Sequence, residues 1–137
     1  MAEQISVHDN ELLSYTVNCA ESKITLRTAY RDREPYEYTE VLFSGVVAYH
    51  FESDNFSTLL FDIIEETVEA IYAEYKELFE ARKNYGWPAV DYNTEQDLLA
   101  KLREQDIRGF SISSSYGMTG FVLASEMQRA PGTARSS

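Results

Sequence analysis

The chain has 137 residues, a length typical of one domain, and its 44% hydrophobic and 13% aromatic content excludes an intrinsically disordered protein. Its 23 acidic and 12 basic residues give a formal net charge of -11, which disfavours binding to nucleic acid and to anionic membranes. The single cysteine, Cys19, excludes an internal disulfide, and Met1 to Val7 lack the basic and apolar regions of a signal peptide. No apolar run approaches the length of a membrane span. We therefore expect a cytoplasmic protein in which Cys19 is a small buried side chain.

The first half of the chain has the period-two pattern of β-strands. Apolar and polar residues alternate from Leu12 to Tyr30 on both sides of a turn at 20–23, which predicts a hairpin. The segment Tyr36–Phe51 is apolar on both faces and predicts a central strand, with a bulge or a close backbone approach at Gly45. The period of the dense apolar run Phe56–Ile64 does not separate strand from helix, and we favour a strand.

The second half begins with helical spacing. Apolar residues three and four positions apart over Val68–Lys83 predict an amphipathic helix, which ends before the glycine and proline that follow it. Asn93 or Thr94 can cap a second helix that runs to about Gln105.

A final hairpin is predicted around Tyr116 and Gly117. Its strands are Phe110–Ser115 and Thr119–Ser125, with Phe110 and Ile112 facing Phe121 and Leu123 across the pair. The order of strands, helices and strands predicts an α+β fold, with an antiparallel sheet of about five to six strands and two helices packed on one face. Residues 1–127 would form this single domain, and residues 128–137 a disordered C-terminal tail.

Negative charge is concentrated in the predicted helical region. Twelve of the acids lie between Asp62 and Asp106, where the chain has five basic residues. The loop after the first helix adds a tryptophan and tyrosines, so an aromatic anchor inside an acidic rim would suit a basic protein partner. We predict these contact residues: Glu65, Glu66, Glu69, Glu74, Glu77, Glu80, Trp87, Asp91 and Tyr92. Two structural interpretations stay open, a solvated acidic helix face and a Trp87 that caps the core.

Catalytic patterns are weak by comparison. His50, with Glu52 and Asp54 close by, and His8 are candidates for metal binding or acid–base chemistry, but their spacing matches no zinc site. The serines at 113–115 lack the glycine spacing of a nucleophile elbow, and the scattered glycines form no phosphate loop. We therefore expect no catalytic residue, no metal and no cofactor.

The first half of the chain resembles small bacterial immunity proteins of polymorphic toxin and contact-dependent inhibition systems. The resemblance rests on five runs: His8-Asp9-Asn10, Leu13-Ser14-Tyr15-x-Val17, Ile24-x-Leu26-x-Thr28, Phe43-x-Gly45-Val46-x-x-Tyr49-x-Phe51 and Phe61-Asp62-Ile63-x-Glu65. It implies an α+β protein without enzymatic activity that binds and blocks a cognate toxin domain. It carries no catalytic or contact residue over to this chain.

Three hypotheses follow. The first is an immunity protein that blocks a toxin with a basic, nuclease-like surface by stoichiometric occlusion. The second is a small-ligand-binding module or enzyme that uses an open sheet face around His50. The third is an acidic adaptor subunit of a larger assembly.

Overall fold

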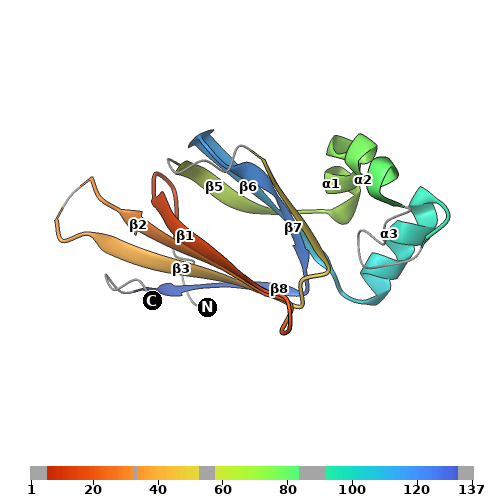
Figure 1. Cartoon of the computed structure of the whole chain (residues 1–137), viewed down its shortest axis with the longest axis horizontal. Coiled ribbons are helices and arrows are strands. Elements are labelled where there is room, and N and C mark those ends of the chain that lie inside the picture. Colours follow the sequence, from red (N-terminus) through yellow and green to blue (C-terminus); the bar gives the residue numbers. More distant parts are fainter. Residues whose placement is uncertain (1–5, 33, 53–57, 84–91, 133–137) are drawn as a thin grey trace.

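The computed structural model describes residues 6–32, 34–52, 58–83 and 92–132. These residues form one eight-stranded antiparallel sheet and three short helices (Figure 1). The strands are β1 (Glu11–Asn18), β2 (Lys23–Tyr30), β3 (Glu37–Ser44), β4 (Ala48–Glu52), β5 (Leu59–Glu66), β6 (Arg108–Tyr116), β7 (Thr119–Ala124) and β8 (Glu126–Pro131). The helices are α1 (Val68–Glu74), α2 (Lys76–Arg82) and α3 (Glu95–Glu104). The strand order across the sheet is β4-β7-β6-β5-β1-β2-β3-β8.

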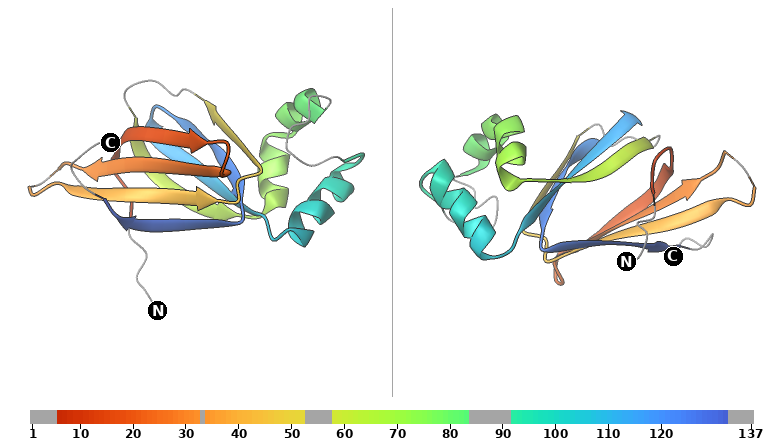
Figure 2. Two further views of the ribbon diagram at one scale, coloured as in Figure 1. Left: turned by 60° about the horizontal axis from the view of Figure 1, so that its bottom comes forward. Right: turned by 180° about the vertical axis from the view of Figure 1, so that it is seen from behind.

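The sheet bends so that two groups of four strands face each other (Figures 1 and 2). We call β4, β5, β6 and β7 the helix-side half, and β1, β2, β3 and β8 the far half. The two halves are joined by a short contact, in which Glu11 of β1 pairs with Leu59 of β5. Both halves contribute to one buried core, which includes Ile24, Leu26, Val41 and Phe43 from the far half and Ile63, Phe110, Ile112 and Val122 from the helix-side half.

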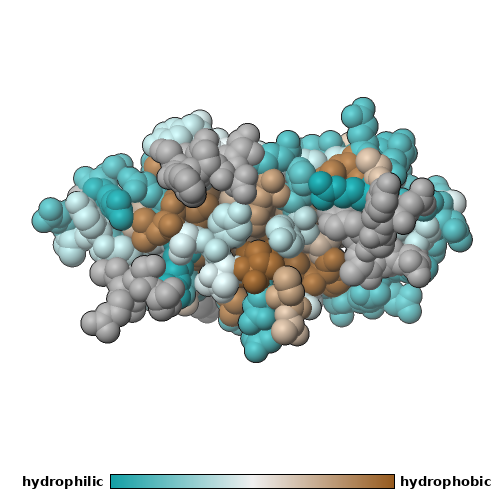
Figure 3. All heavy atoms as spheres, in the orientation of Figure 1, coloured by the Kyte–Doolittle hydropathy of each residue, from teal (hydrophilic) through white to brown (hydrophobic). Residues whose placement is uncertain are grey.

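A second core lies between the helices and the outer face of the helix-side half. It includes Ala48, Phe121 and Leu123 from the strands and Ile71, Phe79, Leu98 and Leu102 from the helices. The helices lie together at one end of the molecule, so they cover only part of this face (Figure 1). Hydrophilic residues cover both ends of the molecule in Figure 3, and hydrophobic residues show along its middle.

The predicted α+β fold with five to six strands and two helices on one face is wrong. Two extra strands arise because the segment predicted as one central strand forms β3 and β4, and because part of the predicted tail forms β8. The helices pack at one end of half of the sheet, and the opposite face of that half is covered by other strands rather than open to solvent.

Both predicted hairpins are confirmed. β1 pairs with β2 around a turn in which Ser22 has a φ of 55°. β6 pairs with β7, although the predicted register is off by one residue, since Phe110 lies opposite Val122 and Ile112 lies opposite Gly120. Because a shift of one residue exchanges the two faces of a strand, Phe121 and Leu123 lie in the core under the helices, whereas Phe110 and Ile112 lie in the core between the two halves.

Gly45 ends β3 and separates it from β4. Its φ is 64°, and a side chain there would meet the Ser125 hydroxyl, with a Cβ–Oγ separation of 2.0 Å. The Ser125 N–H donates to the carbonyl oxygens of Ser44 (3.0 Å) and Gly45 (3.2 Å). The close backbone approach expected at Gly45 is therefore confirmed, but the chain turns there, and β4 joins the helix-side half by pairing with β7.

The predicted disordered tail is wrong as far as Pro131. β8 pairs with β3 from Ser44–Glu126 to Thr39–Pro131, and the Gly132 N–H donates to the Tyr38 carbonyl at 2.8 Å. Arg129 extends from β8 to the helix-side half, where its Nη2 donates to the Ile63 carbonyl at 2.7 Å. The Arg129 guanidinium also lies 4.0 Å from Asp62, and its burial lowers its pKa. Residues 133–137 lie outside the described residues.

The remaining predictions are mostly confirmed. The strand predicted over Phe56–Ile64 is confirmed by β5 from Leu59 onward, while Phe56 lies outside the described residues. Of the two predicted caps, Asn93 and Thr94, it is Thr94 that caps α3. Cys19 is exposed in the β1–β2 turn rather than buried. In the described ranges no helix is long and apolar enough to cross a membrane.

Candidate functional site

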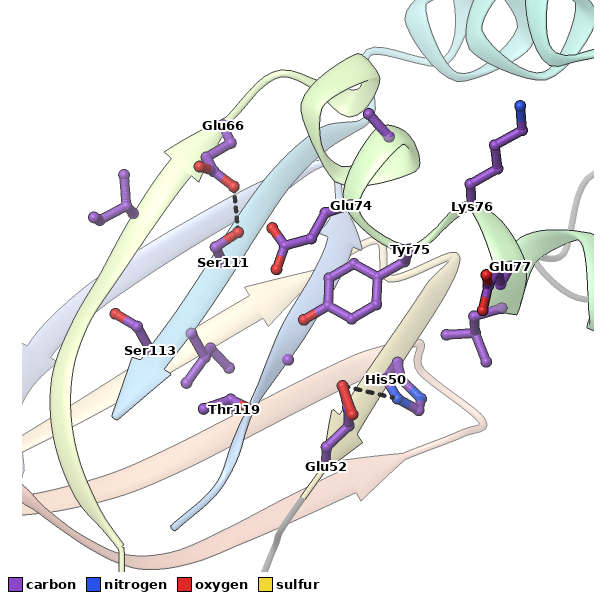
Figure 4. Close-up of a pocket in the computed structure, with 15 residues that line it drawn as sticks. His50, Glu52, Glu66, Glu74, Tyr75, Lys76, Glu77, Ser111, Ser113 and Thr119 are labelled. Atoms are coloured by element: carbon purple, nitrogen blue, oxygen red, sulfur yellow. Dashed lines mark hydrogen bonds and ion pairs between the residues drawn. The ribbon is translucent and has the colours of Figure 1, made fainter. Parts of the chain in front are cut away.

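An acidic groove lies on the part of the helix-side half that the helices leave uncovered. Its volume is about 1200 Å³. It is lined from four strands and from the junction of α1 and α2, and its polar side chains include His50, Glu52, Glu66, Glu74, Glu77 and Ser111 (Figure 4). The name acidic groove refers below to this depression and the residues that line it.

Strand alternation brings the polar side chains to the groove. In β4, His50 and Glu52 share the face of Ala48, which belongs to the core under the helices. In β6, Ser111 and Ser113 face the groove, whereas Phe110 and Ile112 belong to the core between the two halves. Alternation along each strand therefore places these polar side chains on the face that the helices cover only in part.

The junction between the helices supplies the opposite wall. The predicted helix Val68–Lys83 is interrupted at Tyr75, whose φ of -113° and ψ of 26° are not helical. Its N–H still donates to the Ile71 carbonyl (3.0 Å), and its carbonyl accepts from the Phe79 N–H (3.1 Å). Glu74 and Glu77, which lie on either side of Tyr75, both line the groove.

Tyr75 lies in the middle of this wall. Its ring contacts Phe121, with 4.7 Å between centroids, and His50, with 5.9 Å. Burial, followed by the negative charges of Glu74, Glu52 and Glu66, raises the pKa of Tyr75 to about 12. The hydroxyl therefore stays protonated at neutral pH, and the shift reflects first the burial of Tyr75 and then the nearby carboxylates.

Few positive charges offset this potential. Lys76 lines the groove, and His50 Nε2 lies 3.6 Å from a Glu52 carboxylate oxygen. Glu66 accepts a hydrogen bond from the Ser111 hydroxyl. Neither Glu74 nor Glu77 makes an ion pair with a residue in the described part of the chain.

The structure brings three of the nine predicted contact residues together in the groove: Glu66, Glu74 and Glu77. Glu65 and Glu69 point elsewhere and form ion pairs, Glu65 with Arg108 (3.3 Å) and Glu69 with Arg103. Both carboxylates remain partly exposed in these pairs, and their contact with a partner stays a prediction.

Glu80 and Tyr92 do not line the acidic groove. Burial and then the charge of Glu80 raise the pKa of Tyr72, which places Glu80 near the helical core. Tyr92 is buried there, and its hydroxyl donates to the Phe79 carbonyl at 3.2 Å. Tyr92 therefore lies in the core under the helices rather than in the acidic groove, and its contact with a partner stays a prediction. Two further predicted contacts, Trp87 and Asp91, lie outside the described residues.

The two histidines occupy different places. His50 is in the acidic groove, and its side chain is 19% exposed. His8 does not line the groove and lies beside Phe61 of β5. Its Nδ1 is 2.8 Å from the Phe61 carbonyl oxygen, and its ring contacts the Phe61 ring. Among the described residues, no group of three histidine, cysteine or acidic side chains is placed to hold a metal ion.

Sequence reasoning missed part of the groove. Ser111 and Ser113 looked like the polar face of an ordinary strand, and Tyr75 looked like one member of an apolar helix stripe. The alternation in β4 and β6 could have indicated the groove. In these strands polar residues occupy the face that helices were expected to cover. Polar side chains on that face indicate that part of it is left uncovered.

Comparisons with protein-family models, with curated proteins and with solved structures give no match. The binding partner of the acidic groove must therefore be inferred from the shape, the charge and the side chains of the groove.

Proposed function

We propose that this protein is an immunity protein that binds a cognate bacterial toxin domain through the acidic groove and blocks it by one-to-one occlusion. The observation that supports the proposal most directly is the pair Glu74 and Glu77, two acids beside Tyr75 that have no ion-pair partner among the described residues. A basic partner surface would supply the missing positive charges.

The form of the groove favours a protein partner over a small ligand. It is an open depression of about 1200 Å³ with acids on two opposite walls, Glu66 and Glu52 on the strands and Glu74 and Glu77 on the helices. Such a shape can receive several long cationic side chains at once. A nuclease-like toxin surface carries such side chains because it holds phosphates.

The whole-molecule charge supports the same proposal. A net charge of -11 attracts a basic partner over a distance of about 8 Å at physiological ionic strength. It also increases the rate of encounter. In this proposal the protein acts in the cytoplasm of the toxin-producing cell and carries out no reaction.

The test uses the toxin domain encoded next to this protein's gene, purified with it after co-expression. We expect a one-to-one complex whose affinity falls about tenfold or more in the double variant E74Q/E77Q, since each removes an acid from the interface. The matched control is E104Q/E126Q, which removes the same charge from exposed positions on α3 and β8. Equal affinity of the two variants would exclude the groove as the docking site.

A second candidate function uses His50 as a reactive group. It is favoured by the position of His50 in the groove, next to Glu52 at 3.6 Å. The variant H50N separates the two functions, because it keeps a polar side chain of similar reach but removes the imidazole that acid–base chemistry would require. Toxin protection should survive in H50N if the protein is an immunity protein.

A further inference from the structure

The edge of β4 beside the acidic groove is a second feature suited to a partner. β4 stands first in the strand order of the sheet and pairs with β7 on one side. Along its other edge, no strand among the described residues is paired with it. An edge strand presents a row of unpaired N–H and C=O groups, to which an extended segment of another chain can add.

The two faces of β4 differ in chemistry. His50 and Glu52 point into the acidic groove (Figure 4). Tyr49 and Phe51 point to the opposite face, where the Phe51 ring contacts Tyr49 (5.1 Å between centroids) and Tyr15 of β1 (5.3 Å). Tyr49 and Tyr15 are each 37% exposed. One face of β4 is therefore acidic, and the other is aromatic and partly exposed.

We infer that β4 receives an extended segment of the partner protein as an added antiparallel or parallel strand. This inference rests on the proposed function and specifies how the partner binds. Successive side chains of a strand point to opposite faces, so the added segment would alternate basic side chains, which enter the acidic groove, with apolar side chains, which cover Tyr49 and Tyr15. The backbone hydrogen bonds would supply affinity, and the alternation would supply specificity.

The other edge of the sheet is less suitable. β8 contains Pro131, which has no N–H to donate, and its Arg129 side chain is engaged with the Ile63 carbonyl across the core. Its exposed side chains do not border the acidic groove. The edge of β4, which borders the acidic groove, is therefore the better site for an added strand.

The test uses three short acetylated peptides. In the first, arginine alternates with valine; the second has the same sequence with N-methyl groups on alternate peptide nitrogens; and the third has glutamate in place of arginine. Binding is measured by titration, and the exchange of the β4 amide hydrogens by NMR. We expect the arginine peptide to bind and to slow exchange in β4, N-methylation to weaken binding at least about tenfold, and the glutamate peptide not to bind.

Two outcomes would overturn the inference: equal binding of the N-methylated peptide, or no binding of the arginine peptide. The acid-to-amide variant E74Q/E77Q separates this inference from the proposed function. If the N-methylated peptide binds the wild type as tightly as the arginine peptide and E74Q/E77Q weakens both, the groove binds cations but β4 adds no strand. If it weakens neither while β4 exchange still slows, strand addition stands and the groove is not the docking site.

Discussion

At the scale of single residues, Tyr75 links the fold to the candidate site. It interrupts the predicted helix, packs on Phe121 and places its hydroxyl among three carboxylates. From the sequence, Tyr75 could be assigned to the buried stripe of a helix, and that assignment is partly correct. Its neighbours from β4 and β5 could not be predicted, because they reach it through strand pairings between segments far apart in the chain.

The raised pKa of Tyr75 has a consequence for stability. Because its pKa is about 12 in the folded state against 10.0 ordinarily, the folded protein holds this proton more tightly than the unfolded chain. The resulting contribution to stability is complete below pH 10 and is lost as the pH rises towards 12. We expect the urea midpoint to fall less between about pH 9 and about pH 11 in Y75F than in the wild type. Equal falls in the two proteins would show that the pKa of Tyr75 is not raised in the folded protein.

Gly120 fixes how closely β4 approaches β7. Its φ is 155°, and an added Cβ would lie 1.8 Å from the His50 carbonyl oxygen. We expect G120A to lower the free energy of unfolding by about 2 kcal/mol or more, since a backbone atom must move in addition to the conformational cost. Denaturant unfolding measures the change. The control is T119A, one residue away on the same strand, for which we expect a change within about 0.5 kcal/mol.

At the scale of elements, local signals predicted most strands and helices correctly. Both hairpins have clear alternation and turns, and Thr94 caps α3, where its hydroxyl accepts from the Asp97 N–H at 3.1 Å. The strand β8 was missed because its sequence is short, polar and ends in proline. Its strand conformation comes from pairing with β3 and from the reach of Arg129, neither of which is a local property.

The importance of β8 is testable by truncation. A chain that ends after Gly132 keeps the whole of β8, whereas a chain that ends after Met127 loses most of its pairing with β3 and all contacts of Arg129. We expect the first chain to match the full chain in thermal unfolding and the second to be strongly destabilised. A disordered tail would predict no difference between them.

Arg129 can be tested alone. The variant R129M keeps much of the length of the side chain but leaves the Ile63 carbonyl without its donor and Asp62 without a nearby positive charge. We expect a loss of about 1–3 kcal/mol in the free energy of unfolding. R129K should retain part of this stability because its ammonium group can still donate. If R129M proves as stable as the wild type, the contact between β8 and β5 does not matter for the fold.

At the scale of the whole molecule, the arrangement of the two halves decides where the site lies. The sequence predicted a sheet, amphipathic helices and a concentration of acids, but not that the sheet bends at the chain reversals near Gly45 and Ser125. The bend buries one face of the helix-side half, and the helices cover one end of the other face. The acids of β4 and β5 meet those of the helices on what remains, which no local pattern could have shown.

The measurement that tests the central claim most directly is the association rate with the cognate toxin domain at rising ionic strength. For the wild type and for E104Q/E126Q, the rate should fall steeply and to a similar degree as salt is added, because the acidic groove attracts the basic partner surface. For E74Q/E77Q, the rate should be lower at low salt and should fall less steeply. A salt dependence that is the same in E74Q/E77Q and in the control variant would contradict the role of the acidic groove in docking.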